Sequence, residues 1–259
     1  STWKFCVLFC HAFRSPGRRC YPHAKGFSIG ARGAHGMLCS YRMGIGHAPL
    51  SNLYESLVFF AWCIILLHLF VEWRYRNRII GLIVSLLAVS ALAYASLKPD
   101  QIQPLIPALK SNWLIAHVVT CFIGYGAFAV AFGVSLMYLL KNRSSGGKHR
   151  SLNSFPKAKV LDELTYRMII LGFLFLSIGI ITGAVWANSA WGRYWGWDPK
   201  ETWALIVWLN YAAWLHLRLT KGWRGVPLAW WAVVGLFVTT FAFLGVNMFL
   251  SGLHSYGEL

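Results

Sequence analysis

Acidic side chains are scarce in this sequence. Only 8 of its 259 residues are Asp or Glu, against 24 Lys and Arg, and charged residues of both signs make up 12% of the chain. That share is about half of what an ordinary soluble domain carries. Together with 57% apolar residues and a mean hydropathy of +0.53, it excludes a typical water-soluble globular domain.

Cysteine patterns that bind zinc or form redox pairs are also missing. None of the six cysteines belongs to a Cys-x-x-Cys pair. Cys63 and Cys121 lie inside apolar runs, which predicts buried packing residues. The other four lie within residues 1–46, a basic segment without any acidic residue that matches no recognisable motif. We therefore assign no function to residues 1–46 and treat 47–259 as the functional domain.

The apolar runs predict an all-α polytopic transmembrane bundle with about six spans. The expected spans are 56–73, 79–97, 113–140, 168–186, 199–219 and 227–250. The connections after the first, third and fifth spans hold three, six and three basic residues, whereas the other two hold two each and also contain acid. The positive-inside rule then places the strongly basic connections in the cytoplasm. Most of the net charge of +16 is therefore a topology signal, and no nucleic-acid partner is expected.

A tryptophan-rich stretch, residues 186–203, separates the fourth and fifth spans and holds five of the fourteen tryptophans. Its second half predicts a helix that begins near Pro199, because Asp198 can cap it and Glu201 stands three residues later, as in a capping box. The stretch from Trp191 to Trp197 is the expected loop. An interfacial tryptophan belt is one explanation, and an aromatic surface for a large planar ligand is the other.

The amino-acid sequence of this stretch resembles that of a known family. Trp-Gly-x-x-Trp-x-Trp-Asp-Pro-Lys-Glu-Thr-Trp is similar to the tryptophan-rich "WWD" signature of cytochrome c assembly proteins, and the Asp-Pro-Lys-Glu-Thr ending to the CcsA/ResC branch. The resemblance extends from about Gly46 to the C-terminus and includes the segment 46–56. It implies a haem-handling protein with haem b as cofactor, in which Trp191, Trp195, Trp197 and Asp198 belong to the binding surface.

Two histidines are expected on the same face as the tryptophan stretch. His117 stands at the outer end of the third span and His254 just beyond the sixth. Two neutral imidazoles could ligate a haem iron from its two sides, although each could also be an ordinary interfacial histidine. The family resemblance implies the first role, since its members place one outward histidine before the WWD segment and one near the C-terminus.

Histidines inside the spans are hypotheses for function by default. His216 lies about 17 residues after Pro199, roughly 25 Å along the fifth span at 1.5 Å per residue. It matches the family's intramembrane histidine, whose haem takes its second ligand from a ResB-like (CcsB-like) partner subunit. A hydrogen bond to Asn210 or Tyr211 is the alternative. His68 has no motif around it, which predicts a packed or helix-bonded side chain, and His47 receives no ligand role.

The resemblance implies delivery of haem to the outer face for covalent attachment to an apocytochrome c, whose Cys-x-x-Cys-His thiols add to the haem vinyl groups. The chain would be a subunit of a holocytochrome c synthase, embedded in lipid, with a ResB-like partner and no catalytic side chain of its own. We expect the bacterial cytoplasmic (inner) membrane, with the thylakoid membrane as the alternative. A CcmC-like haem carrier or exporter and a non-haem membrane transporter remain alternative functions.

Overall fold

The computed structural model describes residues 52–75, 79–98, 109–144 and 155–250. Contacts divide the chain into the units Ser1–Met37 and Leu38–Leu259, and every described residue belongs to the second unit. Residues 1–46, His47 and His254 lie outside the described residues. The helices are α3 (Leu53–Tyr75), α4 (Ile79–Ala95), α5 (Asn112–Ser144), α6 (Ala158–Trp191), α7 (Pro199–Thr220) and α8 (Val226–Thr240), which the π-helical η3 (Phe241–Gly245) and α9 (Val246–Phe249) continue.

The part of the chain that the structure describes is all-helical, as the sequence predicts. Four helices are long and apolar enough to cross a membrane: Leu53–Tyr75, Asn112–Arg143, Ala158–Trp191 and Val226–Phe249. The chain is thus a multi-pass membrane protein. Of the other two expected spans, α4 has only 17 residues. Helix α7 has 22, but tryptophan, tyrosine, asparagine and histidine take the place of aliphatic side chains in it.

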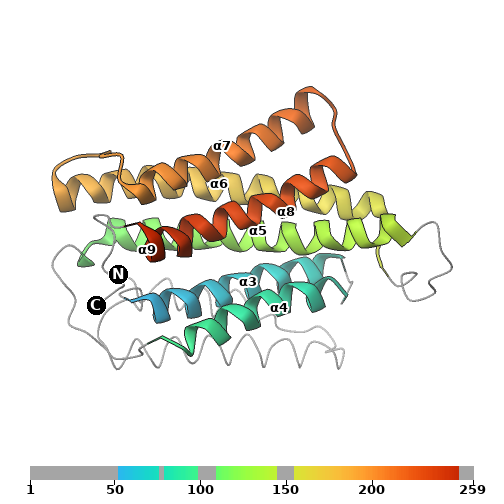
Figure 1. Cartoon of the computed structure of the whole chain (residues 1–259), viewed down its shortest axis with the longest axis horizontal. Coiled ribbons are helices and arrows are strands. Elements are labelled where there is room, and N and C mark those ends of the chain that lie inside the picture. The colour runs from blue at the N-terminus through green and yellow to red at the C-terminus, as the bar shows by residue number, and fades with distance from the viewer. Residues whose placement is uncertain (1–51, 76–78, 99–108, 145–154, 251–259) are drawn as a thin grey trace, which may run out of the picture. The chain divides into compact units, whose positions relative to one another are not determined.

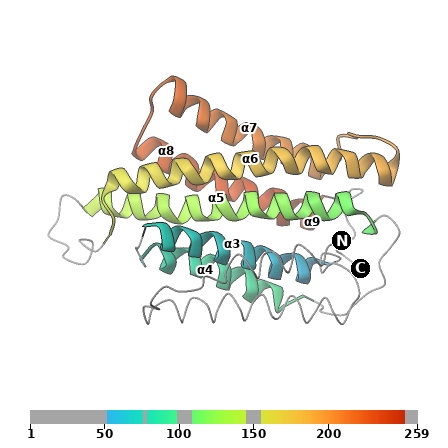
Figure 2. The ribbon, with the colours of Figure 1, turned by 180° about the vertical axis from the view of Figure 1, so that it is seen from behind.

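Successive helices run in alternating directions (Figure 1; Figure 2 shows the opposite side). The starts of α3, α5 and α7 therefore lie at one end of the bundle, together with the tryptophan stretch and α9. The ends of the same three helices lie at the other end. The three strongly basic connections follow these helix ends, so the arrangement agrees with the topology that the charge pattern predicts.

Glycine brings α5 and α6 close together. A Cβ at Gly124 would lie 3.1 Å from the Gly172 carbonyl oxygen, and a Cβ at Gly172 would lie 2.4 Å from the Phe128 ring. Two turns further along α6, a Cβ at Gly179 would lie 2.5 Å from the Cys121 sulfur. Small residues at this spacing allow helix backbones to approach closely within a membrane, where lipid provides no hydrophobic driving force between helices.

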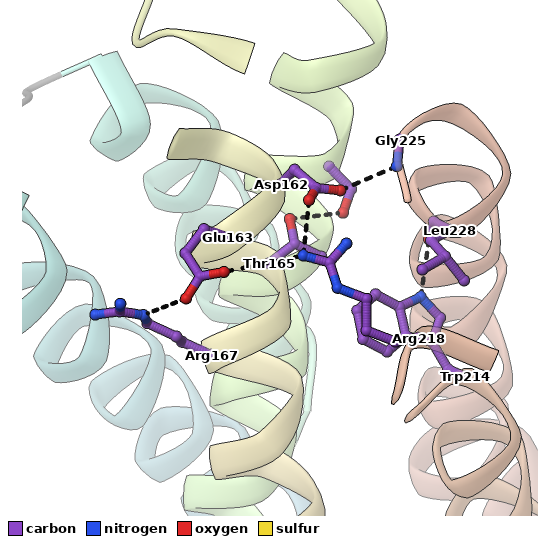
Figure 3. Close-up of polar contacts among 9 residues, drawn as sticks. Asp162, Glu163, Thr165, Arg167, Trp214, Arg218, Gly225 and Leu228 are labelled. Carbon is purple, nitrogen blue, oxygen red and sulfur yellow. Dashed lines mark hydrogen bonds and ion pairs between the residues drawn. The ribbon is translucent and has the colours of Figure 1, made fainter. Parts of the chain in front are cut away.

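At the end opposite the tryptophan stretch, a buried ion pair joins α6 to α7 (Figure 3). Arg218, whose side chain is only 3% exposed, places Nη2 2.7 Å from Asp162 Oδ2. The other Asp162 oxygen accepts a hydrogen bond from the Gly225 amide at 3.0 Å, which attaches the start of α8. Trp214 donates its indole N–H to the Leu228 carbonyl at 2.9 Å. One carboxylate thus connects three helices.

Removing this carboxylate should destabilise the protein more than removing the whole pair. Asp162→Ala leaves the buried guanidinium with only the more distant Glu163 carboxylate, 3.9 Å away, as a counter-charge, so the loss should approach the roughly 3–5 kcal/mol of a broken buried pair. The double variant Asp162→Ala/Arg218→Met should recover a large part of that loss, because no buried charge remains. Thermal unfolding in detergent measures both.

The control is Arg167→Gln, which breaks the exposed Glu163–Arg167 pair on the same helix and should change the unfolding temperature little. A double variant no more stable than Asp162→Ala would contradict the role given to the pair.

Candidate functional site

The tryptophan stretch is part helix and part loop. The expectation that the fourth span ends at Trp186 is wrong, because α6 continues to Trp191. Neither glycine nor proline occurs between Trp186 and Gly192, and Gly192 ends the helix in the left-handed conformation at φ 74°. The predicted start of the next helix is confirmed: α7 begins at Pro199, and Asp198 and Glu201 form a capping box.

Glu201 does more than cap this helix. Its Oε2 accepts hydrogen bonds from the Gly196 amide at 2.7 Å and the Asp198 amide at 3.1 Å. Between these two amides stands Trp197, at φ 56° the one non-glycine residue with positive φ in the described chain. A bulky residue in this conformation costs on the order of 1–3 kcal/mol, which the surrounding contacts must offset. The Glu201 carboxylate supplies two of those contacts.

The tryptophans fall into two groups. Trp186 and Trp195 line a cavity. Trp191 stands edge-on to Trp186, with ring centroids 4.8 Å apart, and Trp197 stands edge-on to Trp195 at 5.7 Å. Trp197 is 69% exposed and is not among the cavity-lining residues, while Asp198 is buried as the helix cap. The structure therefore brings Trp195 directly to the cavity and places Trp191 and Trp197 behind or beside it.

The cavity measures about 220 Å³ and lies where α5 and α7 begin and α6 ends. Its wall is mostly aromatic and aliphatic, with the π-helical turn η3 contributing Ala242 and Phe243. The aromatic and polar side chains on the wall are Asn52, Ser56, His117, Phe122, Tyr125, Trp186, Tyr194, Trp195, Lys200, Glu201, Phe243 and Asn247. A mostly apolar cavity with a few polar groups is the usual form of a site for a small molecule or cofactor.

His117 is held on this wall in a defined orientation. Its Nδ1 lies 2.7 Å from the Gly179 carbonyl oxygen, and its ring stacks on Trp186 at 13° with centroids 6.3 Å apart. The ring occupies the space beside Gly183, where a Cβ would lie 2.6 Å from Nδ1. A carbonyl can only accept, so Nδ1 carries the proton and Nε2 keeps its lone pair. This is the tautomer that a haem iron requires of an axial histidine, so the residue fits the implied cofactor.

We searched the described part of the chain for a site that could bind a bare metal ion. The described residues contain no group of three or more His, Cys, Asp or Glu side chains that could hold one. A ligand that brings its own equatorial donors needs only one axial group from this helix.

The two histidines within the predicted spans, His68 and His216, lie in different environments. His68 is buried and its Nε2 lies 3.3 Å from Glu72 Oε2, which confirms a packed, helix-bonded side chain. His216 is exposed on the surface of α7. The alternative of a hydrogen bond from His216 to Asn210 or Tyr211 is wrong, because the Asn210 amide nitrogen and the Tyr211 hydroxyl are both buried without a hydrogen-bond partner. The Asn210 oxygen accepts the Trp231 indole N–H at 3.0 Å. His216 is thus left facing outward from the chain.

The prediction for the cysteines is confirmed, whereas several residues of the cavity wall were not predicted from the sequence. Cys63 and Cys121 are free and buried, as expected. Trp186 received no role from the sequence, although its spacing of three residues from Gly183 could have indicated that both share a helix face. Lys200 and Phe243 on the cavity wall were not foreseen either, and no local pattern marks them.

Fold and site together define a class: a multi-pass helical membrane protein that builds an aromatic, histidine-containing cavity at one end of its bundle. A family model described as cytochrome c assembly protein matches residues 50–254. The chain belongs to this family.

Individual relatives agree with the family match. The cytochrome c biogenesis protein CcsA of Parasynechococcus marenigrum (strain WH8102) is 45% identical over 239 residues, covering 82% of this chain and 78% of the relative. The protein of the same name from Prochlorococcus marinus (strain NATL1A) is 44% identical over 243 residues, or 82% and 77%. For the one from Chlamydomonas reinhardtii the identity is 48% over 219 residues, and this chain spans 62% of its length.

The Glu201 hydrogen bonds can be tested by comparing two substitutions. Glu201→Ala removes the acceptor of both amides, so the Gly196 and Asp198 amides should lose protection worth about 1–3 kcal/mol in hydrogen exchange. Glu201→Gln keeps a carbonyl oxygen in the same place and should retain most of the protection. Equal loss in both variants would mean that charge alone, rather than the two hydrogen bonds, orders the loop.

Proposed function

We propose that this chain holds haem at the outer cavity, with His117 as one axial ligand, and presents it for covalent attachment to an apocytochrome c. The observation that carries the proposal is the His117 side chain, whose Nδ1 is engaged by the Gly179 carbonyl. Haem, when bound, supplies the vinyl groups to which the thiols of a Cys-x-x-Cys-His segment add. The residues of this chain bind, orient and shield the ligand.

The aromatic wall supports that role. Trp186 and Trp195 offer flat apolar surfaces beside His117, and Phe122 and Phe243 extend the wall on the α5 and η3 sides. Such surfaces exclude water from a bound cofactor, which limits unwanted redox chemistry. The second axial ligand is proposed to be His254, on the resemblance alone, since this residue lies outside the described part of the chain.

A second haem, within the membrane, is proposed at His216. Its imidazole is exposed on α7, and neither Asn210 nor Tyr211 offers it a hydrogen bond. An intramembrane histidine that faces away from its own helix bundle is positioned to ligate a haem that is shared with another subunit. The proposed partner is a ResB-like (CcsB-like) subunit, which makes this chain one part of a holocytochrome c synthase.

The alternatives are a CcmC-like haem carrier and a non-haem transporter. Outward exposure of His216 favours a shared haem over a proton path through the chain, because a relay histidine should face the bundle interior or a water-filled cavity.

The named relatives bear on the membrane in which the protein resides, since they come from cyanobacteria and a green alga. We therefore propose the thylakoid membrane and the bacterial cytoplasmic membrane as locations of equal standing.

The outer site is tested by His117→Gly in the complex co-expressed with its partner subunit and a client apocytochrome c. Holocytochrome formation and the haem absorption bands should both fall about tenfold or more, and added imidazole should restore part of each by filling the vacant position. His68→Gln, which keeps a donor to Glu72, is the matched histidine control. Unchanged maturation in His117→Gly without imidazole would overturn the ligand assignment.

The intramembrane site is tested by His216→Ala. The variant complex should assemble normally yet lose most of its haem, and the outer site should be depleted too if haem arrives from within the membrane. Leu209→Ala is the control, because Leu209 lies two turns earlier on the same exposed face of α7. A His216→Ala complex with full haem content would return this side chain to a lipid-facing role.

A further inference from the structure

The turn between α7 and α8 presents two cations at the end of the bundle opposite the tryptophan stretch. The sequence places three basic residues in this connection, but Arg218 is buried in its ion pair with Asp162. Lys221 and Arg224 are both exposed. Trp223, which stands between them, is 46% exposed. Two positive side chains and an indole thus share one short surface turn, residues 221–225.

Backbone contacts hold this turn in one conformation. The Lys221 and Trp223 amides both donate to the Leu217 carbonyl, each at 3.2 Å. Gly222 and Gly225 adopt φ angles of 68° and 77°, which other residues disfavour. The Gly225 amide is also the donor that attaches the turn to α6. The two cations are therefore presented from an ordered backbone.

Positive charge exceeds negative charge around the turn. The charged side chains that it joins through printed contacts or directly in sequence are Asp162, Glu163, Arg167, Arg218, Lys221 and Arg224. Asp162 acts electrostatically on Arg224 as well, but its ion pair is with Arg218. Two carboxylates against four cations leave a net charge of two positive units, however the individual interactions are divided. An external anion is needed to balance this excess.

The surroundings of the turn favour the headgroup of a lipid as that anion. Leu219, two residues before Lys221, is 64% exposed, so the surface of α7 changes from apolar to cationic within about 3 Å along the helix axis. Tryptophan is enriched at such a boundary between hydrocarbon and headgroups. The charge pattern of the connections predicts that this end of the bundle is cytoplasmic, where anionic lipids give the membrane surface a negative potential.

We propose that residues 221–225 bind the headgroup of an anionic phospholipid. Lys221 and Arg224 contact its phosphate, and Trp223 lies beside the upper part of its acyl chains. A free phosphate ion would gain only the charge contacts, whereas a lipid also covers the exposed Leu219 and Trp223 side chains. The inference is independent of the proposed haem sites, since none of these residues belongs to the cavity wall.

The test compares phosphatidylglycerol with phosphatidylcholine of the same acyl chains, titrated into the full chain in neutral detergent and counted by native mass spectrometry. Lys221→Gln and Arg224→Gln should each weaken phosphatidylglycerol binding about fivefold, and the double variant about 30-fold. Phosphatidylcholine should be affected little, because its choline group already neutralises the phosphate. Trp223→Ala should weaken both lipids equally.

Arg74→Gln is the matched control. Arg74 ends α3 at the same end of the bundle, but α3 and α7 lie on opposite sides of α5 (Figures 1 and 2). The substitution removes one charge from the chain, as Lys221→Gln does, and should leave phosphatidylglycerol binding almost unchanged. An unaltered unfolding temperature in neutral detergent shows that the double variant is folded.

Four results would overturn the inference. Equal affinities of the unaltered protein for the two lipids would show that no anionic headgroup is selected. Equal weakening by Arg74→Gln and Lys221→Gln would show that binding follows net charge rather than the turn. Inorganic phosphate that competes as well as the lipid would make the turn a free-anion site. A double variant that releases another protein subunit but keeps its lipid would make the turn a protein contact.

Discussion

The close contact between α5 and α6 is the constraint on which the site depends. Where glycines replace larger side chains on α6, the backbone of α5 comes near enough for His117 to lie over Gly183 and bond to the Gly179 carbonyl. The same helix then presents Trp186 one turn later, stacked on the imidazole. A methyl group at Gly183 would displace the ring, and with it both the tautomer and the stacking. Helix packing and ligand chemistry are thus set by the same few atoms.

Helix α7 is fixed at both of its ends by polar contacts. Asp198 and Glu201 order its start, and Arg218 ties its last turn to Asp162 on α6. Arg218 points inward, and at 100° per residue a side chain two positions earlier lies about 200° around the helix. His216 must therefore face outward, as it does. The ion pair at one end consequently sets which face of α7 meets a neighbouring subunit or lipid.

Local features were predictable from the sequence because local chemistry decides them. The start of α7 follows from Asp198, Pro199 and Glu201 alone, and the buried cysteines follow from the apolar runs around them. The extension of α6 to Trp191 was missed, because hydropathy marks where a membrane span ends and not where a helix ends. The Asn210–Trp231 pair and the cavity wall depend on how helices meet, which no single segment reveals.

The scarcity of acidic residues gains a physical meaning from these contacts. Among the described residues, Glu72 pairs with His68, Asp162 with Arg218, and Glu163 with Arg167, while Asp198 and Glu201 accept backbone amides. These carboxylates are engaged within the fold and cannot neutralise the remaining basic side chains. With 24 basic against 8 acidic residues, most counter-charges must come from outside the chain. At the basic end of the bundle, anionic lipid headgroups can supply them.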